Sequence, residues 1–311
     1  GLCLVGSEMC IRDSSKIMPL PDHITVYPGH GAGSACGKKM SSETSALLGD
    51  QKQTNYALDD LTKEEFVKEL TTGILPPPQY FAKAAAQNKK GYKSIDQVFE
   101  SSLNAMSVEQ VQKEIKNVSL IIDTRHRDDF RDGHIVNSWF IGLNGQFAPW
   151  AGALIEDLHQ KIIIVAEAGK EEEAIMRLAR VGYDNVVGYL DGGIDAWKAS
   201  GKPVGRVNSI TSDDFAKNDN GDAQVMDVRK PSEFEQGHLA EARNIPLDFF
   251  LEELKLVDVS RSYAVHCESG YRSMIAASIL QAKGMANITD IIGGFGALKE
   301  TSVKIVEPEM A

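Results

Sequence analysis

The chain contains the stretch IIDTRHRDDFRDGHI at residues 121–135 and repeats its pattern as VMDVRKPSEFEQGHL at residues 225–239. An aspartate, an arginine, a phenylalanine and a Gly-His pair coincide when the second stretch is shifted back by 104 positions. Because self-similarity at a fixed spacing marks a duplicated unit, we predict two copies of one domain. A unit of about 105 residues is long enough for each copy to hold its own hydrophobic core.

Two further pairs of segments extend the repeat toward the end of each copy. Residues 162–169 (IIIVAEAG) correspond to residues 263–270 (YAVHCESG). Residues 191–198 (DGGIDAWK) correspond to residues 292–299 (IGGFGALK). Both pairs are separated by 101 positions, so the repeat continues through most of the C-terminal two thirds of the chain.

Strand and helix patterns alternate within the second copy. The predicted elements are a strand over 223–228, a helix over 231–236, a strand over 262–267, a helix over 273–283 and a strand over 287–292. These strands are continuously apolar, which favours a parallel sheet covered by helices on both faces, an α/β fold. Ligands of such folds bind at the carboxyl ends of the strands, where Cys267 stands.

Composition and charge exclude several classes of protein. Of the 311 residues, 42% are hydrophobic and 25% are charged, which is typical of a globular chain and not of a disordered or collagen-like one. The longest aliphatic run, residues 162–166, is far shorter than the about 20 apolar residues of a membrane span. The net charge of −11 repels phosphate backbones and anionic membranes, so we expect neither a nucleic-acid partner nor a membrane partner.

The cysteines and the N-terminus indicate the compartment. Cys3, Cys10, Cys36 and Cys267 match neither a disulfide framework nor a zinc template, so we expect a reducing, cytoplasmic location. Residues 1–14 lack the features of a signal peptide and resemble a translated sequencing adapter, so we set them aside as a non-native segment. On this interpretation the chain is the C-terminal fragment of a longer protein.

The loop after the second strand of the second copy carries reactive chemistry. It reads HCESGYRS, residues 266–273, and opens the next predicted helix. Inward-pointing backbone N–H groups and the helix dipole stabilise a thiolate at Cys267. Gly270 permits the turn, and Arg272 supplies a fixed cation with paired donors for an anionic substrate. A single cysteine after a strand is more often an inert core residue, but these neighbours favour a nucleophile.

Both copies resemble rhodanese domains. The second copy carries the loop pattern C-x-x-G-x-R of the sulfurtransferases in that family at residues 267–272. Residues 227–229 (DVR) and 237–238 (GH) match a second motif of the family, and the resemblance covers residues 97–311. It implies two α/β domains, each a parallel sheet with helices on both faces.

The resemblance implies a sulfurtransferase with small substrates. Cys267 would accept a sulfane sulfur from thiosulfate or a low-molecular-weight persulfide and hold it as a persulfide. A thiol, sulfite or cyanide acceptor would then remove the sulfur, with no cofactor, and the oligomeric state is left open. The implied catalytic residues are Cys267 and Arg272, and the implied substrate-binding loop residues are Glu268, Ser269, Gly270, Tyr271 and Ser273.

Three other hypotheses are kept. A tyrosine phosphatase also uses a His-Cys loop with an arginine, but it places five residues between cysteine and arginine where this chain has four, and Glu268 would repel a phosphate dianion. A persulfide carrier or sensor would pass sulfur to a partner protein without fast turnover. A pure docking role would leave Cys267 dispensable. Turnover assays separate these hypotheses from the sulfurtransferase.

The first copy differs from the loop pattern at the positions that correspond to the cysteine and the arginine. Ala166 replaces the cysteine, Lys170 the tyrosine and Glu171 the arginine. Because no persulfide can form on alanine, we predict that the first copy is an inactive scaffold or docking domain. We expect the polar residues shared by the copies to be structural; they are Asp123, Arg125, His134, Asp227, Arg229 and His238.

The N-terminal part resembles another family. YPGHG at residues 27–31, with Cys36 after it, is similar to the last metal-motif segment of the metallo-β-lactamase superfamily, in particular of persulfide dioxygenases fused to rhodanese domains. His30 alone cannot hold iron, so we expect it to be vestigial, with no metal and no dioxygenase activity here, although the parent protein would act in sulfide oxidation. A Thr62-to-Glu65 capping pattern predicts a helix over 61–70.

These inferences combine into four predicted segments. They are residues 1–14, the adapter-derived segment; residues 15–96, the C-terminal remnant of a metallo-β-lactamase domain; residues 97–204, the inactive rhodanese-like domain; and residues 205–311, the active rhodanese domain.

Overall fold

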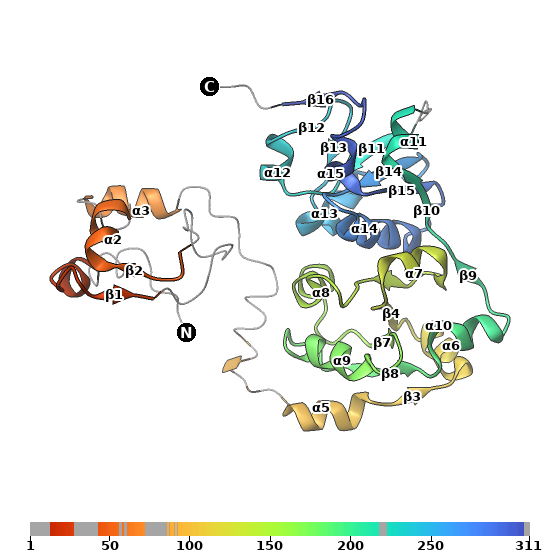
Figure 1. The fold of residues 1–311 in the computed structure, drawn as a ribbon. Coiled ribbons are helices and arrows are strands. Elements are labelled where there is room, and N and C mark those ends of the chain that lie inside the picture. Colours follow the sequence, from red (N-terminus) through yellow and green to blue (C-terminus); the bar gives the residue numbers. More distant parts are fainter. Residues whose placement is uncertain are drawn as a thin grey trace. The chain divides into compact units, whose positions relative to one another are not determined.

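The chain forms two compact units, residues 1–77 and 78–311, and each is considered by itself. The computed structural model shown in Figure 1 describes residues 13–27, 43–55, 58, 61–71, 86, 88, 89, 91, 93–217 and 223–307. Within these ranges, no helix combines the length and apolarity that a bilayer span requires.

The first unit contains short elements. They are η1 (Asp13–Ile17), β1 (Thr25–Val26), β2 (Ala46–Leu47), α2 (Leu48–Thr54) and α3 (Lys63–Thr71), with β1 and β2 antiparallel. The predicted capping pattern is confirmed at the start of α3. The Thr62 N–H donates to Glu65 Oε2 at 2.9 Å, and the Glu65 N–H donates to Thr62 Oγ1 at 3.3 Å. The motif around His30 lies outside the described residues.

The first copy of the repeat is a five-stranded parallel sheet in the order β3-β8-β7-β4-β6. Its strands are β3 (Ala105–Met106), β4 (Leu120–Asp123), β6 (Trp139–Phe140), β7 (Ile162–Val165) and β8 (Val186–Leu190). Its helices are α5 (Ile95–Ser102), α6 (Val108–Lys116), α7 (Arg127–Asp132), α8 (Phe147–Leu154), α9 (Glu171–Ala179) and α10 (Gly193–Ala199). The first copy also has a separate two-stranded antiparallel sheet, formed by β5 (His134–Ile135) and β9 (Val204–Gly205).

The second copy has the same topology, β10-β15-β14-β11-β13. Its strands are β10 (Asn208–Thr211), β11 (Gln224–Asp227), β13 (Arg243–Asn244), β14 (Tyr263–His266) and β15 (Ile288–Ile292). Its helices are α11 (Ser212–Lys217), α12 (Pro231–Glu235), η3 (Leu247–Phe249), α13 (Phe250–Glu253), η4 (Leu254–Leu256), α14 (Tyr271–Ala282) and α15 (Gly294–Leu298). The antiparallel pair β12 (His238–Leu239) with β16 (Ile305–Val306) corresponds to β5 with β9. The predicted duplication and parallel sheets are confirmed.

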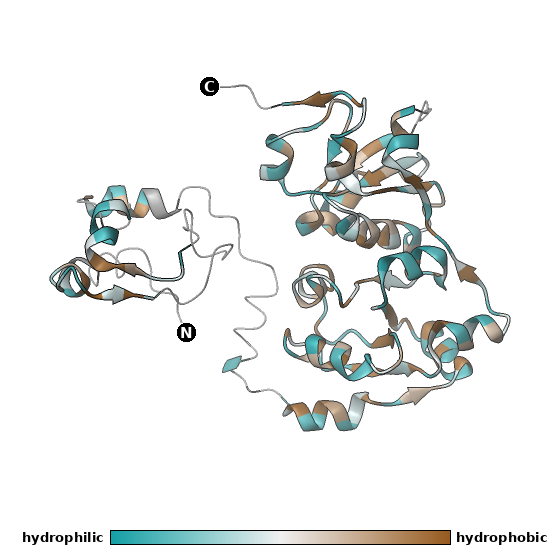
Figure 2. Cartoon of the chain, viewed as in Figure 1, coloured by the Kyte–Doolittle hydropathy of each residue, from teal (hydrophilic) through white to brown (hydrophobic). Residues whose placement is uncertain are grey.

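One large apolar core spans both copies, and each copy also has a smaller buried cluster of its own, as the sequence predicted. Phe140 and Phe147 of the first copy belong to the same buried cluster as Met274 and Ile275 of the second. Helix α14 packs against β6 and α7, and α8 packs against η3. Figure 2 shows the hydrophilic colours gathered on α7 and α12, while the sheet strands are largely apolar. Because burial of apolar side chains drives association, the copies form one folded body.

Helix α14 is buried on nearly every side. Residues 273–280 of this helix, which the sequence predicted over 273–283, are all buried. The reason is that one side of α14 covers its own sheet and another lies on the first copy. A buried hydrogen bond from the Phe140 N–H to Ser278 Oγ, at 2.9 Å, fixes this contact. A helix that is apolar all round is stable only when enclosed in this way.

A buried carboxylate in β15 lies close to this contact. Asp290 is 3% exposed, and within the described part of the chain its Oδ1 has no hydrogen-bond partner. Burial raises the pKa of Asp290 to about 6, against the opposite influence of Ser273 and of the charges of Arg127 and Arg131. Ionisation of this group near neutral pH therefore works against the folded state.

We predict that Asp290→Asn flattens part of the dependence of stability on pH. A folded-state pKa above the unfolded value of about 3.9 gives stability that is present below that value and lost as the pH rises through about 6. Between about pH 4 and pH 7 the native protein should lose on the order of 2 to 3 kcal/mol that the asparagine variant does not lose. Urea unfolding of both proteins across this range measures the difference, with the exposed Asp213→Asn as control. Parallel curves for the native and Asp290→Asn proteins would contradict the prediction.

Candidate active site

Cys267 lies directly after β14, at the carboxyl edge of the second sheet. Its side chain is 1% exposed, and its Sγ accepts a hydrogen bond from the Gly270 N–H at 3.1 Å. Gly270 caps α14 with a φ of 105°, a left-handed conformation that L side chains rarely adopt. The loop therefore curls around the sulfur, as the sequence predicted, and directs a backbone donor at it.

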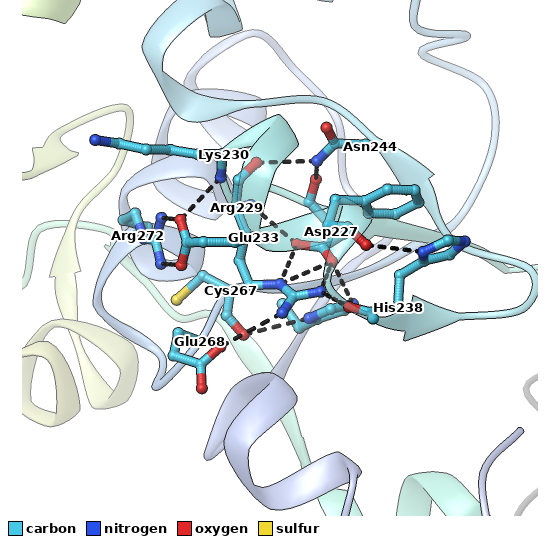
Figure 3. Close-up of polar contacts among 12 residues, drawn as sticks. Asp227, Arg229, Lys230, Glu233, His238, Asn244, Cys267, Glu268 and Arg272 are labelled. Carbon is cyan, nitrogen blue, oxygen red and sulfur yellow. Dashed lines mark hydrogen bonds and ion pairs between the residues drawn. The ribbon is translucent and has the colours of Figure 1, made fainter. Parts of the chain in front are cut away.

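Arg272 is held by a carboxylate. Its Nη1 and Nη2 donate to Glu233 Oε2 and Oε1 at 2.6 and 2.7 Å, and Figure 3 shows this pair beside Cys267. The sequence predicted that these paired donors face an incoming anion; instead they bind Glu233 of α12. Although burial lowers the pKa of Arg272, the hydrogen bonds to Glu233 and the nearby charge of Cys267 raise it overall. Arg272 thus stays charged and fixes the first turn of α14.

Glu233 has a second partner at the start of α12. Its Oε2 also accepts the Lys230 backbone N–H at 3.0 Å. Burial raises the pKa of Glu233, but hydrogen bonds from Arg272 and from the Lys230 N–H bring it below its usual value overall. The carboxylate therefore stays ionised and links α12 to α14.

A buried ion pair between Arg229 and Asp227 lies next to the cysteine loop. Arg229 Nε donates to Asp227 Oδ2 at 2.9 Å, and its Nη2 donates to Asp227 Oδ2 at 2.7 Å and to the Gly237 carbonyl at 2.8 Å. Its guanidinium carbon lies 3.8 Å from the centre of the Phe295 ring. The two families of contact, ionic and aromatic, fix the chain between β11 and β12.

The first copy holds the equivalent pair. Arg125 Nη2 donates to Asp123 Oδ2 at 2.6 Å and to the Gly133 carbonyl at 2.8 Å. The histidines that follow both glycines, His134 and His238, stack on the phenylalanine four residues earlier. These side chains connect secondary-structure elements, which is the structural role expected from the sequence.

The loop backbone is also tied to the start of α15. The Phe295 N–H donates to the Cys267 carbonyl at 2.7 Å, and the Gly296 N–H donates to the Glu268 carbonyl at 3.0 Å. A Cβ at Gly294 would collide with the Cys267 carbonyl, so the close approach of α15 to this loop requires a glycine there. The Glu268 side chain is 46% exposed, and its Oε2 lies 3.5 Å from Arg229 Nη1.

His266 takes no part at the sulfur. Adjacent residues of a strand point to opposite faces, and the His266 ring is fully buried with Nε2 3.8 Å from Asp227 Oδ2. Burial lowers the pKa of His266 despite the nearby Asp227 charge, so its imidazole is neutral at pH 7. A His-Cys pair in the sequence is therefore not a nucleophile with its general base here.

The Tyr271 side chain, which belongs to the predicted loop, contacts the first copy instead of Cys267. Tyr271 donates from Oη to the Gly142 carbonyl of the first copy at 2.6 Å, and its ring meets Phe140 edge-on at 5.6 Å. Burial raises the pKa of Tyr271, which keeps the phenol protonated. Ser273 is buried in the first turn of α14, and within the described residues its Oγ has no hydrogen-bond partner. The structure thus groups Glu268, Gly270 and Arg272 around Cys267.

The loop of the first copy has the same glycine turn as the cysteine loop, but it has no cysteine. Ala166 follows β7 as Cys267 follows β14, and Gly169 has a φ of 83°. Lys170 pairs with Glu173 at 2.9 Å, inside the same helical segment. A cavity of about 180 Å³ lies over this loop; its lining residues are Thr124, Arg125, His126, Leu143, Asn144, Glu167, Lys170 and Glu173.

No metal site is visible in the part of the chain that the structure describes, where no three His, Cys, Asp or Glu side chains are grouped to bind an ion. His30 lies outside the described residues, as do the other three cysteines.

Sequence reasoning missed two residues that contact this site. Glu233 lies inside the repeated motif, but no pattern in the sequence indicates that it binds Arg272. Arg127 of the first copy donates from Nη1 to the Ser269 carbonyl across 142 positions of sequence, and no local pattern indicates that contact.

The fold and the site define a class: a duplicated parallel α/β domain with one enclosed cysteine loop at the carboxyl edge of the second sheet. The model of the rhodanese-like domain family matches residues 107–200 and 211–301, more than half of the chain. The chain therefore belongs to the rhodanese-like domain family.

Three known proteins illustrate the similarity. Uncharacterized protein YqhL of Bacillus subtilis (strain 168) is 38% identical over 73 residues, which are 24% of this chain and 58% of that protein. Thiosulfate sulfurtransferase 16, chloroplastic, of Arabidopsis thaliana is 34% identical over 86 residues, 24% of this chain and 72% of that protein. A metallo-β-lactamase crystal structure from Staphylococcus aureus subsp. aureus COL is 27% identical with a TM-score of 0.47, covering 59% of this chain and 49% of that one. The chain thus spans about half to three quarters of these proteins.

Proposed function

We propose that the chain is a sulfurtransferase that carries sulfane sulfur on Cys267. The donor is thiosulfate or a low-molecular-weight persulfide, and the acceptor is a thiol, sulfite or cyanide. The observation that carries the proposal is the Gly270 N–H directed at Sγ within a loop enclosed at the start of α14. Membership of the rhodanese-like family and the similarity to a protein named thiosulfate sulfurtransferase support it.

The reaction divides into two displacements. The Cys267 thiolate attacks the outer sulfur of thiosulfate, a new sulfur–sulfur bond forms, and sulfite leaves with the electron pair of the broken bond. The acceptor anion then attacks the outer sulfur of the persulfide, and the Cys267 thiolate is released. No oxidant or reductant is consumed. The Gly270 N–H donates to Sγ, the atom that carries the negative charge of the thiolate before the first displacement and after the second.

The test is a variant in which Cys267 is the sole cysteine, with Cys3, Cys10 and Cys36 changed to serine. After exposure to thiosulfate and removal of the excess, mass spectrometry should show an adduct of about 32 Da on the Cys267 peptide. Addition of cyanide should remove the adduct and release thiocyanate over many turnovers. Absence of the adduct would refute the proposal.

We predict that Glu233→Gln changes the choice of donor. The variant keeps Arg272 but removes the carboxylate that neutralises it at 2.6 and 2.7 Å. A freed guanidinium attracts dianionic thiosulfate more than a less charged persulfide. The ratio of kcat/KM for thiosulfate to that for the persulfide should rise about three- to tenfold.

The matched control is Glu235→Gln, which removes an exposed carboxylate from the same helix. An unchanged donor ratio in Glu233→Gln would mean that the charge of Arg272 is not felt by the donor. Urea unfolding of both variants shows whether α12 is still in place.

One observation favours a second candidate function. Cys267 is 1% exposed, which restricts the access that fast turnover with free donors requires. A persulfide carrier that docks to a partner protein needs no such turnover. Stoichiometric labelling of Cys267 with negligible steady-state thiocyanate formation would favour the carrier over the sulfurtransferase.

We propose further that the parent protein acts in sulfide or persulfide oxidation in the cytoplasm, with residues 15–96 derived from a metallo-β-lactamase fold. The YPGHG motif at residues 27–31 supports this origin. The domain boundaries follow the four segments set out from the sequence. Sequencing of the coding region upstream is the test: an H-x-H-x-D-H motif supports the origin, and an unrelated sequence contradicts it.

A further inference from the structure

Contacts from the first copy converge on the cysteine loop of the second. Arg127, the first residue of α7, donates from Nη1 to the Ser269 carbonyl. Its guanidinium lies so close to the loop that a Cβ at Gly270 would stand 2.7 Å from Nη1. The hydrogen bond from Tyr271 Oη to the Gly142 carbonyl, at 2.6 Å, holds the next residue of the loop. Three consecutive loop residues thus touch the copy that has no nucleophile.

The contact made by Arg127 fixes the direction of the donor to the sulfur. The Ser269 carbonyl and the Gly270 N–H belong to one peptide unit, which is planar and trans, so they point in opposite directions. The carbonyl points at Arg127, and the N–H therefore points the other way, at Sγ of Cys267 3.1 Å away. A rotation of this peptide would move both groups together.

Arg127 differs from the other arginines at the site because, among the described residues, it forms no close ion pair, although its charge acts to lower the pKa of Asp290. Arg272 pairs with Glu233 at 2.6 Å, and Arg229 pairs with Asp227 at 2.7 Å. Among the described residues, Arg127 makes no ion pair with a carboxylate within 4.0 Å. Its hydrogen bond to the loop carbonyl is charge-assisted and therefore stronger than a neutral one.

We propose that Arg127 of the first copy is a positioning residue for Cys267. By holding the Ser269 carbonyl, it turns the Gly270 N–H toward Sγ and so stabilises the negative charge of the Cys267 thiolate. The inactive first copy is in this way part of the active site of the second. This inference rests on the proposed function for its consequence in catalysis, but the orientation of the loop can be tested without sulfur transfer.

The experiment compares the full chain with Arg127→Met, Arg127→Lys and Arg180→Met, each in the background in which Cys267 is the sole cysteine. Arg180 is an exposed residue at the end of α9 and controls for the loss of one positive charge. The measurements are the rate of Cys267 alkylation by iodoacetamide at neutral pH and the ultraviolet absorbance of the thiolate. Thiosulfate turnover is measured in parallel.

Arg127→Met should slow alkylation and lower kcat by about tenfold, because the N–H donor is still present but no longer held in place. Arg127→Lys keeps a charged donor and should restore most of the rate, and Arg180→Met should match the parent. A parent-like alkylation rate in Arg127→Met would overturn the inference, as would a lysine variant that folds normally and is as slow as the methionine variant. If the parent protein transfers no sulfur, the proposed function fails, yet the alkylation rates still decide the role of Arg127.

Discussion

Cys267→Ser should abolish sulfur transfer while the protein stays folded. Only the thiolate can attack a sulfane sulfur, and removal of such a nucleophile costs at least about a thousandfold in rate. Serine is nearly isosteric, and its Oγ can accept the Gly270 N–H that now donates to Sγ, so no buried donor is left without a partner. Thiocyanate formation and the persulfide adduct should both fall to background.

The comparison with Cys267→Ala separates chemistry from stability. Alanine also removes the nucleophile, but it leaves the Gly270 N–H unpaired in a buried loop, which costs about 1 to 3 kcal/mol. Both variants should therefore be inactive, and the alanine variant should unfold at lower urea concentration. Residual turnover in the serine variant would place the reacting thiol elsewhere in the chain.

Arg229→Met should destabilise the second copy by about 3 to 5 kcal/mol, because it removes one partner of a buried ion pair. Asp227 is fully buried and would keep an uncompensated charge. The Gly237 carbonyl would also lose its donor at 2.8 Å. Urea unfolding measures the loss in free energy of unfolding.

A surface pair provides the control for this variant. Arg261 lies 3.6 Å from Asp258, and both side chains are more than half exposed, so Arg261→Met should change stability by less than about 1 kcal/mol. Replacing both buried partners, with Arg229→Met and Asp227→Leu together, should recover part of the loss. A cost below about 1 kcal/mol for Arg229→Met alone would show that the buried pair contributes little to the fold.

The sequence by itself determined the duplication, the three central strands and two helices of the second copy, and the position of the candidate nucleophile Cys267. These follow from local patterns: apolar runs predict buried strands, and the Gly270 turn places Cys267 where β14 meets α14. The sequence also shows that the first copy has Ala166 where the second has Cys267. Each of these inferences depends only on residues near one another in the chain.

Only the tertiary structure decided which groups meet. The sequence predicted that Arg272 is available to an anionic substrate, but in the structure it binds Glu233, which lies 39 positions away on α12. Arg127 reaches Ser269 across 142 positions, and α14 is enclosed because the first copy lies on its outer side. Such contacts depend on how two sheets pack and not on any local pattern. The periodicity of apolar residues predicts which side chains are buried, but it does not predict which other residues they contact.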